Sequence, residues 1–231
     1  MGNKISSLLI VAALIGPVQP ASAQSVVVDQ GTFSIEINGV ALGSEEFSIR
    51  RAGFGNDAAF IADAVVKLRD ERGQRELHPL LRATAPAGAS DGYQLKVTGS
   101  APVEVTMNLV GPRFVSRFES LEGQEEREFR ARRNTRILES MVAHHYYFLR
   151  DLREGDHTAV ITPLERVEIS LLVGPWLEEE LSLGRNIVPA RRVSFSSDGT
   201  QRTVWFDRQG RVLRVDIPAL GYVAVRADLV G

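Results

Sequence analysis

Hydrophobic and polar side chains alternate with a period of two through most of this chain. A period of two places every second side chain on the same face of a β-strand, so such segments predict half-buried strands. Asn38-Gly39, directly after the first alternating segment, is the strongest short signal for a hairpin turn. The alternation therefore predicts a run of antiparallel hairpins. The clearest alternating segments are residues 32–37, 93–98, 103–109, 203–206 and 213–217.

Residues 60–68 do not follow one period alone. Phe60, Ala64 and Leu68 fit both a helical repeat and a strict alternation, and periodicity cannot separate the two in so short a segment. The neighbouring segments on both sides alternate. We therefore expect a strand here.

Residues 134–152 have the pattern of an amphipathic helix. Asn134 is a suitable N-cap, apolar side chains then recur three, four and seven positions apart, and Gly155 follows as a stop signal. A single helix needs an apolar surface to cover, and a curved sheet offers a concave one. The predicted fold class is therefore mainly β (α+β): a curved antiparallel sheet or half-barrel of hairpins, with one amphipathic helix packed on the concave face.

The first 23 residues differ from the rest and predict a secretory signal peptide. Lys4 is followed by the apolar run 8–15 and by Ala21-Ser22-Ala23, a small-residue cleavage site. The start of the chain also matches a loose myristoylation pattern, which leaves the apolar run and the cleavage site unexplained. We expect cleavage after Ala23, a single half-barrel domain over residues 24–231, and an exported, soluble, periplasmic protein without a transmembrane segment.

Composition narrows the classes of function. The chain contains no cysteine, so neither a disulfide nor a lipid attached to an N-terminal cysteine can hold it. Its net charge of -2 argues against a nucleic-acid partner, which normally requires a basic excess. The arginines in 127–136 are interleaved with Glu125, Glu126 and Glu128, and we interpret this segment as a salt-bridged, solvent-exposed face rather than a surface for anionic lipid.

The segment ESMVAHHYYFLRDL, residues 139–152, carries the most conspicuous candidate chemistry. His144 and His145 are adjacent, whereas two metal ligands on one helix need a spacing of four residues. His145 lies in the apolar stripe with Met141 and Phe148, so packing is the leading interpretation of its ring. Residues 88–92 match the G-x-S-x-G pattern but lie in a loop rather than between a strand and a helix. We expect no catalytic residue, no metal and no cofactor.

The C-terminal segment TVWFDRQGRVLRVDIP, together with the hairpins and the single helix, carries a resemblance to a known family. The chain resembles periplasmic proteins of the lipoprotein-carrier-like half-barrel superfamily, and within it the domain-of-unknown-function families. The resemblance implies a fold that holds acyl chains or other apolar ligands between a curved sheet and its covering helix.

The predicted function is non-enzymatic binding of an apolar or amphipathic ligand, which includes lipid-derived molecules. One alternative is a structural or interaction module of the cell envelope, with a packed core, an envelope protein as partner and no ligand. A second alternative is a hydrolase that uses His144 or His145. The residues expected to line a ligand site are His145, Tyr146, Met141, Phe148, Phe118, Phe195 and Trp205.

Overall fold

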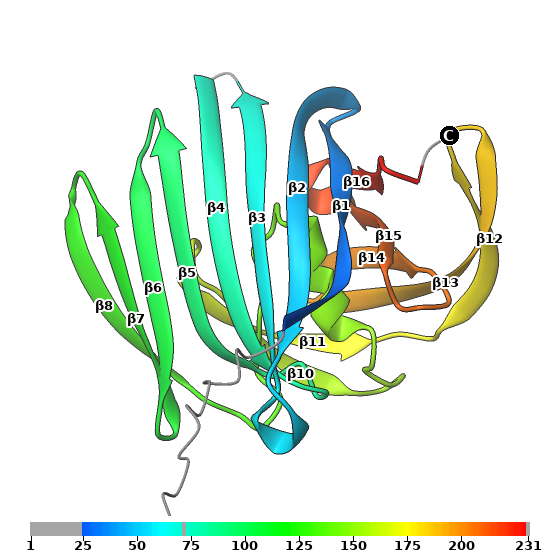
Figure 1. The fold of residues 1–231 in the computed structure, drawn as a ribbon. Coiled ribbons are helices and arrows are strands. Elements are labelled where there is room, and N and C mark those ends of the chain that lie inside the picture. Colours follow the sequence, from blue (N-terminus) through cyan, green and yellow to red (C-terminus); the bar gives the residue numbers. More distant parts are fainter. Residues whose placement is uncertain (1–24, 71–72, 230–231) are drawn as a thin grey trace, which may run out of the picture.

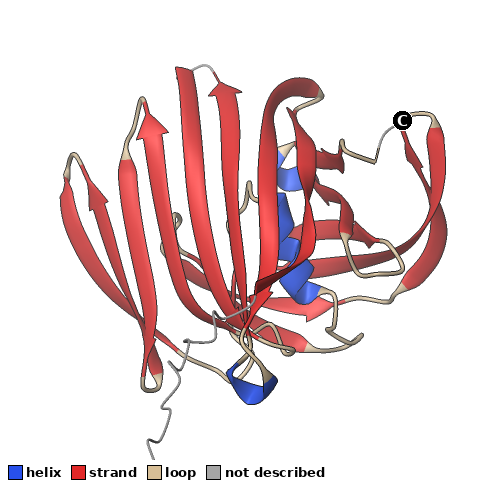
Figure 2. Cartoon of the chain, in the orientation of Figure 1, coloured by secondary structure: helices blue, strands red, loops and turns tan. Residues whose placement is uncertain are grey.

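A computed structural model of the chain describes residues 25–70 and 73–229. The predicted signal peptide and its cleavage site lie outside the described residues. Within the described residues, strands dominate and helices are short (Figure 2).

The strands form one sheet, antiparallel except at β9, in which the first strand lies in the middle of the strand order (Figure 1). Strands β1 to β8 follow one another as a meander, and β1 also pairs with β16, the last strand. From β16 the order continues backwards through β15, β14, β13, β11 and β10 to β9, while β12 pairs with β13. The bounds are β1 Ser25–Ile37, β2 Val40–Ala52, β3 Ala59–Asp70, β4 Gly73–Thr84, β5 Ser90–Gly99, β6 Val103–Val110, β7 Arg113–Ser120, β8 Gly123–Arg130, β9 Arg136–Ile137, β10 His157–Thr162, β11 Val167–Val173, β12 Leu177–Leu183, β13 Asn186–Ser197, β14 Thr200–Phe206, β15 Val212–Ile217 and β16 Tyr222–Arg226.

The predicted fold class, a curved and mainly antiparallel sheet with a helix on its concave side, is confirmed. The sheet curves so that β10 to β16 lie opposite the wall formed by β1 to β5, and a helix lies between them (Figure 1). The ambiguous residues 60–68 form the middle of β3 and pair with β2 and β4, as expected.

One end of the sheet, β9, meets the start of β5 at Ser90. The Ser90 backbone N–H donates to the Thr135 carbonyl at 3.0 Å, and the Ile137 N–H donates to the Ser90 hydroxyl at 2.9 Å. Ser90, the serine of the G-x-S-x-G pattern, therefore joins the start of β5 to β9 and is buried. Strands β6, β7 and β8 extend beyond this junction, and we call them the wing.

The predicted helix over 134–152 is too long. Its N-terminal part is β9, which pairs in parallel with β10, and the helix itself is the 3₁₀ helix η2, Ala143–Leu149. The helix starts at Ala143 because a carboxylate from β2 receives its first N–H groups there, as described below. All seven residues of η2 are buried, so it has no solvent face and is not amphipathic.

The other helices are also short. They are the 3₁₀ turns η1, Gly55–Asp57, and η3, Pro218–Leu220. No helix among the described residues is both long and apolar enough to cross a membrane.

Most of the apolar side chains form one continuous core on the concave side of the sheet, around η2. A second, small cluster lies under the β12–β13 hairpin, which we call the arm. In this cluster Leu181 and Leu183 from β12 pack against Leu213 from β15.

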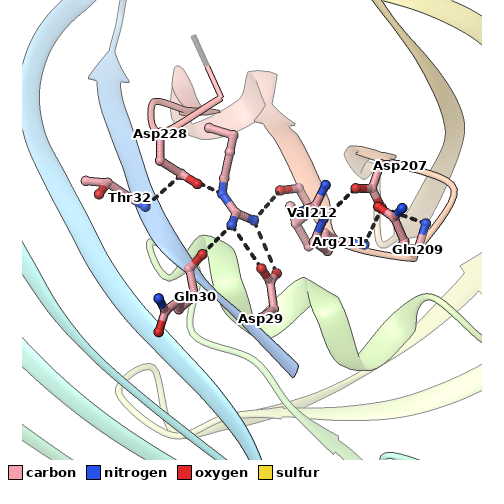
Figure 3. Close-up of polar contacts among 9 residues, drawn as sticks. Asp29, Gln30, Thr32, Asp207, Gln209, Arg211, Val212 and Asp228 are labelled. Atoms are coloured by element: carbon pink, nitrogen blue, oxygen red, sulfur yellow. Dashed lines mark hydrogen bonds and ion pairs between the residues drawn. The ribbon is translucent and has the colours of Figure 1, made fainter. Parts of the chain in front are cut away.

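A buried arginine holds the seam between the first and last strands (Figure 3). Arg226 donates to both Asp29 carboxylate oxygens, at 2.9 and 3.2 Å, and to Asp228 at 2.7 Å. Burial outweighs these contacts at Asp29 and raises the pKa of its carboxyl. Residue 31 of β1 is a glycine, and its missing side chain leaves the room that the guanidinium occupies.

Candidate ligand-binding site

Glu45 of β2 fixes the position and start of η2. Its carboxylate accepts hydrogen bonds from the Ala143 N–H at 2.7 Å, the His144 N–H at 2.9 Å and the His144 ring Nδ1 at 2.7 Å. Glu45 and His144 both have no exposed side-chain surface. The first free N–H groups of a helix need acceptors, and here a buried carboxylate from the facing wall supplies them.

His145 is neutral in this environment. Its Nδ1 accepts the Glu139 backbone N–H at 3.1 Å, so the ring proton is on Nε2. Burial, followed by the neighbouring His144 ring, lowers the pKa of His145 well below 6.5. The His145 ring packs edge-on against the rings of His144 and Tyr93, with centroids 4.6 and 5.7 Å away.

Glu139 extends this buried polar cluster towards the β10–β11 turn. Its carboxylate accepts the Leu164 backbone N–H at 3.0 Å. Burial raises the pKa of Glu139 to about 8, so the carboxyl is mostly protonated at neutral pH. Burial, and then the neighbouring Glu139, also raise the pKa of Tyr93.

A hydrolase that uses His144 or His145 needs a carboxylate that holds the ring, a nucleophile beside the ring, and access for a substrate. This cluster supplies only the carboxylate. Glu45 holds the His144 ring as the acid of a catalytic triad holds its histidine. Among the described residues, however, neither Nε2 atom of the two rings has a hydrogen-bond partner, so no serine is in place as a nucleophile. Both rings have 0% of their surface exposed. Nor does any group of three or more histidine, aspartate or glutamate side chains in the described chain suit a metal ion.

The residues predicted to line a ligand site lie in three places. His145, Tyr146 and Phe148 are buried on η2, Met141 is half-buried just before it, and Phe195 is in the same core. Trp205 lies in the arm cluster, where its Nε1 donates to Glu179 at 2.5 Å. Phe118 lies in a cleft on the wing. The structure places these seven residues in three separate regions and does not bring them together. A ligand contact at any of them stays a prediction.

The cleft at Phe118 is lined by the β5–β6 and β7–β8 turns. These two turns lie at the same end of their strands (Figure 1, upper left). The cleft has a volume of about 540 Å³, in the range of about 300–1,000 Å³ of small-molecule pockets. We call it the hairpin-end cleft. Its lining residues are Ser100, Ala101, Pro102, Val103, Phe118, Ser120, Leu121, Glu122, Gly123, Gln124, Glu125 and Arg166.

Arg166 forms one side of this cleft. It has a left-handed backbone conformation, with φ of 60°, in the β10–β11 turn, and its guanidinium lies over the Phe118 ring, 4.6 Å from the centroid. It also pairs with Glu125 at 2.7 Å, and Arg127 donates to its carbonyl oxygen at 2.9 Å. Hydrogen bonding to Arg127, and then the Arg127 and Arg166 charges, lower the pKa of Glu125. The charges at this side of the cleft are therefore paired.

Of the residues in the hairpin-end cleft, only Phe118 was expected from the sequence. Leu121 and Arg166 belong to no recognisable motif, and Arg166 lies more than forty positions after Leu121 in the chain. The one available signal was Leu121 itself, an apolar residue within a polar turn, whose side chain is 86% exposed.

The comparisons with known proteins are limited to one fold likeness. No protein-family model matches the chain. No curated protein matches it either. Among solved structures, the chain is similar to a β-barrel-like protein of domain of unknown function DUF1849 from Brucella abortus, with a TM-score of 0.44 and 11% sequence identity, over 85% of this chain and 93% of that chain. The resemblance to lipoprotein carriers stays a prediction.

Proposed function

We propose that this protein is an exported, non-enzymatic binding protein whose apolar or amphipathic ligand lies in the hairpin-end cleft. The observation that carries the proposal is the apolar surface formed there by Val103, Phe118 and Leu121 at a cleft of about 540 Å³. The lining combines these apolar side chains with polar ones in similar number, which suits an amphipathic ligand. Lipid-derived molecules belong to this class of ligand.

The packing around η2 supports a ligand site in the hairpin-end cleft rather than one beneath the helix. Phe148 and Tyr147 pack edge-on against Phe60, with ring centroids 6.0 and 5.9 Å away, and His144 stacks on Phe47 at 5.5 Å. None of the five principal clefts of the described chain is lined by a residue of η2. A ligand under the helix would have to displace these rings.

The same packing favours a second candidate function. A structural or interaction module of the cell envelope needs a rigid core and no internal ligand. The buried seam at Arg226 and the filled space around η2 are consistent with such a module. The two candidates differ in whether the hairpin-end cleft binds a ligand.

Titration of the purified protein with a fluorescent fatty acid tests this difference. We expect saturable binding that Leu121→Ser weakens about tenfold, because burying a leucine side chain contributes roughly 1.5–3 kcal/mol. Leu121 is exposed in the free protein, so this change does not disturb the core. Ile187→Ser is the matched control, since Ile187 is an exposed aliphatic residue on the arm (66%).

A protein that takes up no fatty acid would contradict ligand binding and favour the interaction module. Equal weakening by both substitutions would show that the probe binds exposed apolar side chains without a site. Phe118→Ala gives a second measurement at the same cleft and should also weaken binding.

A further inference from the structure

The meander brings alternate turns of the wall to one end of the molecule. In consecutive antiparallel strands, every second turn lies at the same end. The β2–β3 and β6–β7 turns therefore share an end with the start of β1 and with the segment after β8 (Figure 1, bottom). We call this the loop end. The hairpin-end cleft lies at the opposite end of the same strands.

The loop end exposes apolar side chains at the tips of separate elements. Phe54, between two glycines in the β2–β3 turn, has 77% of its surface exposed, and Val110, the last residue of β6, has 59%. Val26 at the start of β1 is 63% exposed and pairs with Arg51 beside that first turn. None of these three side chains belongs to either hydrophobic cluster of the described residues.

The loop end is also basic, unlike the chain as a whole. Five arginines lie there against three carboxylates, whereas the full chain has a net charge of -2. The carboxylates Glu128 and Glu168 pair with Arg113 and Arg132, and Asp57 is the third. The five arginines are Arg51, Arg113, Arg130, Arg132 and Arg133.

The interpretation of 127–136 as a wholly salt-bridged face is therefore correct for only part of the segment. Arg127 pairs with Glu125, and Arg136 is buried and donates to the Phe148 and Ala87 carbonyl oxygens at 3.0 and 2.7 Å. Arg130 and Arg133 are exposed and form no ion pair within the described residues. Their charges remain available at the loop end.

We propose that the loop end docks on the surface of an anionic lipid bilayer. Phe54 and Val110 would enter the headgroup region, and Arg130 and Arg133 would face lipid phosphates. Apolar tips on separate turns with arginines between them fit a broad, flat, negatively charged surface. This inference goes beyond ligand binding, since the hairpin-end cleft points away from the docked surface.

Vesicle co-sedimentation of the full-length chain tests the proposal. The vesicles contain phosphatidylglycerol and phosphatidylcholine in equal amounts, or phosphatidylcholine alone. Two double variants are compared with the unchanged chain: Phe54→Ser with Val110→Ser, and Arg130→Glu with Arg133→Glu. The matched control combines Ile187→Ser with Arg185→Glu, two exposed residues of the arm. Residues 1–24 are the same in every variant, so differences in binding report on the surface.

We expect the unchanged chain and the control to bind the anionic vesicles, and each loop-end variant to bind them at least about tenfold more weakly. Binding of the unchanged chain should also fall as salt is added, because salt screens exposed charges. Equal binding to both kinds of vesicle, or equal binding by all variants, would overturn the proposal. No binding by the unchanged chain would overturn it as well and would point to a protein at this surface. Fatty-acid uptake by the loop-end variants should be normal, which separates this test from that of the cleft.

Discussion

At the scale of single residues, arginines packed on aromatic rings recur throughout this cysteine-free chain. The Arg150 guanidinium lies 3.6 Å from the Tyr147 ring centroid, and that of Arg191 lies 4.5 Å from the Trp176 ring. Arg226 combines such a contact, 4.9 Å from the Phe47 ring, with its buried pairing to Asp29. Guanidinium groups are suited to this position because they can stack and donate hydrogen bonds at once.

The Arg226 cluster predicts the effect of a change at Gly31. A methyl group at residue 31 would lie 2.5 Å from both Arg226 Nη2 and Asp228 Oδ1, so the buried ion pair must shift. We expect Gly31→Ala to lower the free energy of unfolding by about 1–3 kcal/mol, as measured by urea denaturation. Gly92→Ala is the control, because the nearest atom to its methyl group would be 3.8 Å away. Equal stability of the two variants would show that residue 31 is not confined by Arg226.

Glu139 predicts how stability depends on pH. Its folded pKa of about 8 lies above the usual value of 4.5, so the folded state holds a proton that the unfolded state releases. The stabilisation is complete below pH 4.5 and is lost as pH rises towards 8. His145, whose pKa is lowered, acts in the opposite direction and destabilises the fold as pH falls below 6.5.

Above pH 6.5, the change of stability with pH therefore reports on Glu139 and not on His145. Between pH 6.5 and 8 we expect the melting temperature of the unchanged chain to fall and that of Glu139→Gln to stay nearly constant. A glutamine keeps an oxygen that can accept the Leu164 N–H. Parallel curves for the two proteins would contradict a protonated Glu139.

At the scale of elements, the strands could be predicted and the helix only in part. Alternation is a local property, and it identified the strands even in the ambiguous residues 60–68. The bounds of η2 depend on Glu45, which lies 98 positions before Ala143 in the chain. No local pattern contains that contact, and the helical spacing continued through residues that pair with β10 instead.

The contacts of Glu45 provide a test of whether this carboxylate or apolar packing keeps η2 in position. Replacing it with alanine would leave the Ala143 N–H, the His144 N–H and the His144 ring without their buried acceptor. We expect Glu45→Ala to lower the free energy of unfolding by about 3–5 kcal/mol, measured by denaturation. Glu46→Ala is the control, because the neighbouring side chain is exposed. A loss below about 1 kcal/mol, the scale of an ordinary hydrogen bond, would mean that η2 is held by its apolar contacts alone.

At the scale of the whole molecule, the curved sheet separates two surfaces by their chemistry. The β5–β6 and β7–β8 turns form a cleft with exposed apolar side chains at one end, and the basic loop end lies at the other. The candidate site could be predicted only at Phe118, because the cleft joins turns and Arg166 from distant parts of the chain. The helix drew attention in the sequence because its histidines and tyrosines are rare residues, and in the fold they are buried.

The most direct measurement of the central claim is the location of a bound ligand. A fatty acid carrying a diazirine group would be photo-crosslinked to the protein, and the modified residues would be identified by mass spectrometry. We predict modification within 100–103 and 118–125, the two hairpin ends that line the cleft, and its loss when unlabelled fatty acid is in excess. Modification concentrated in Ala143–Leu149 would contradict the claim and place the ligand beneath η2.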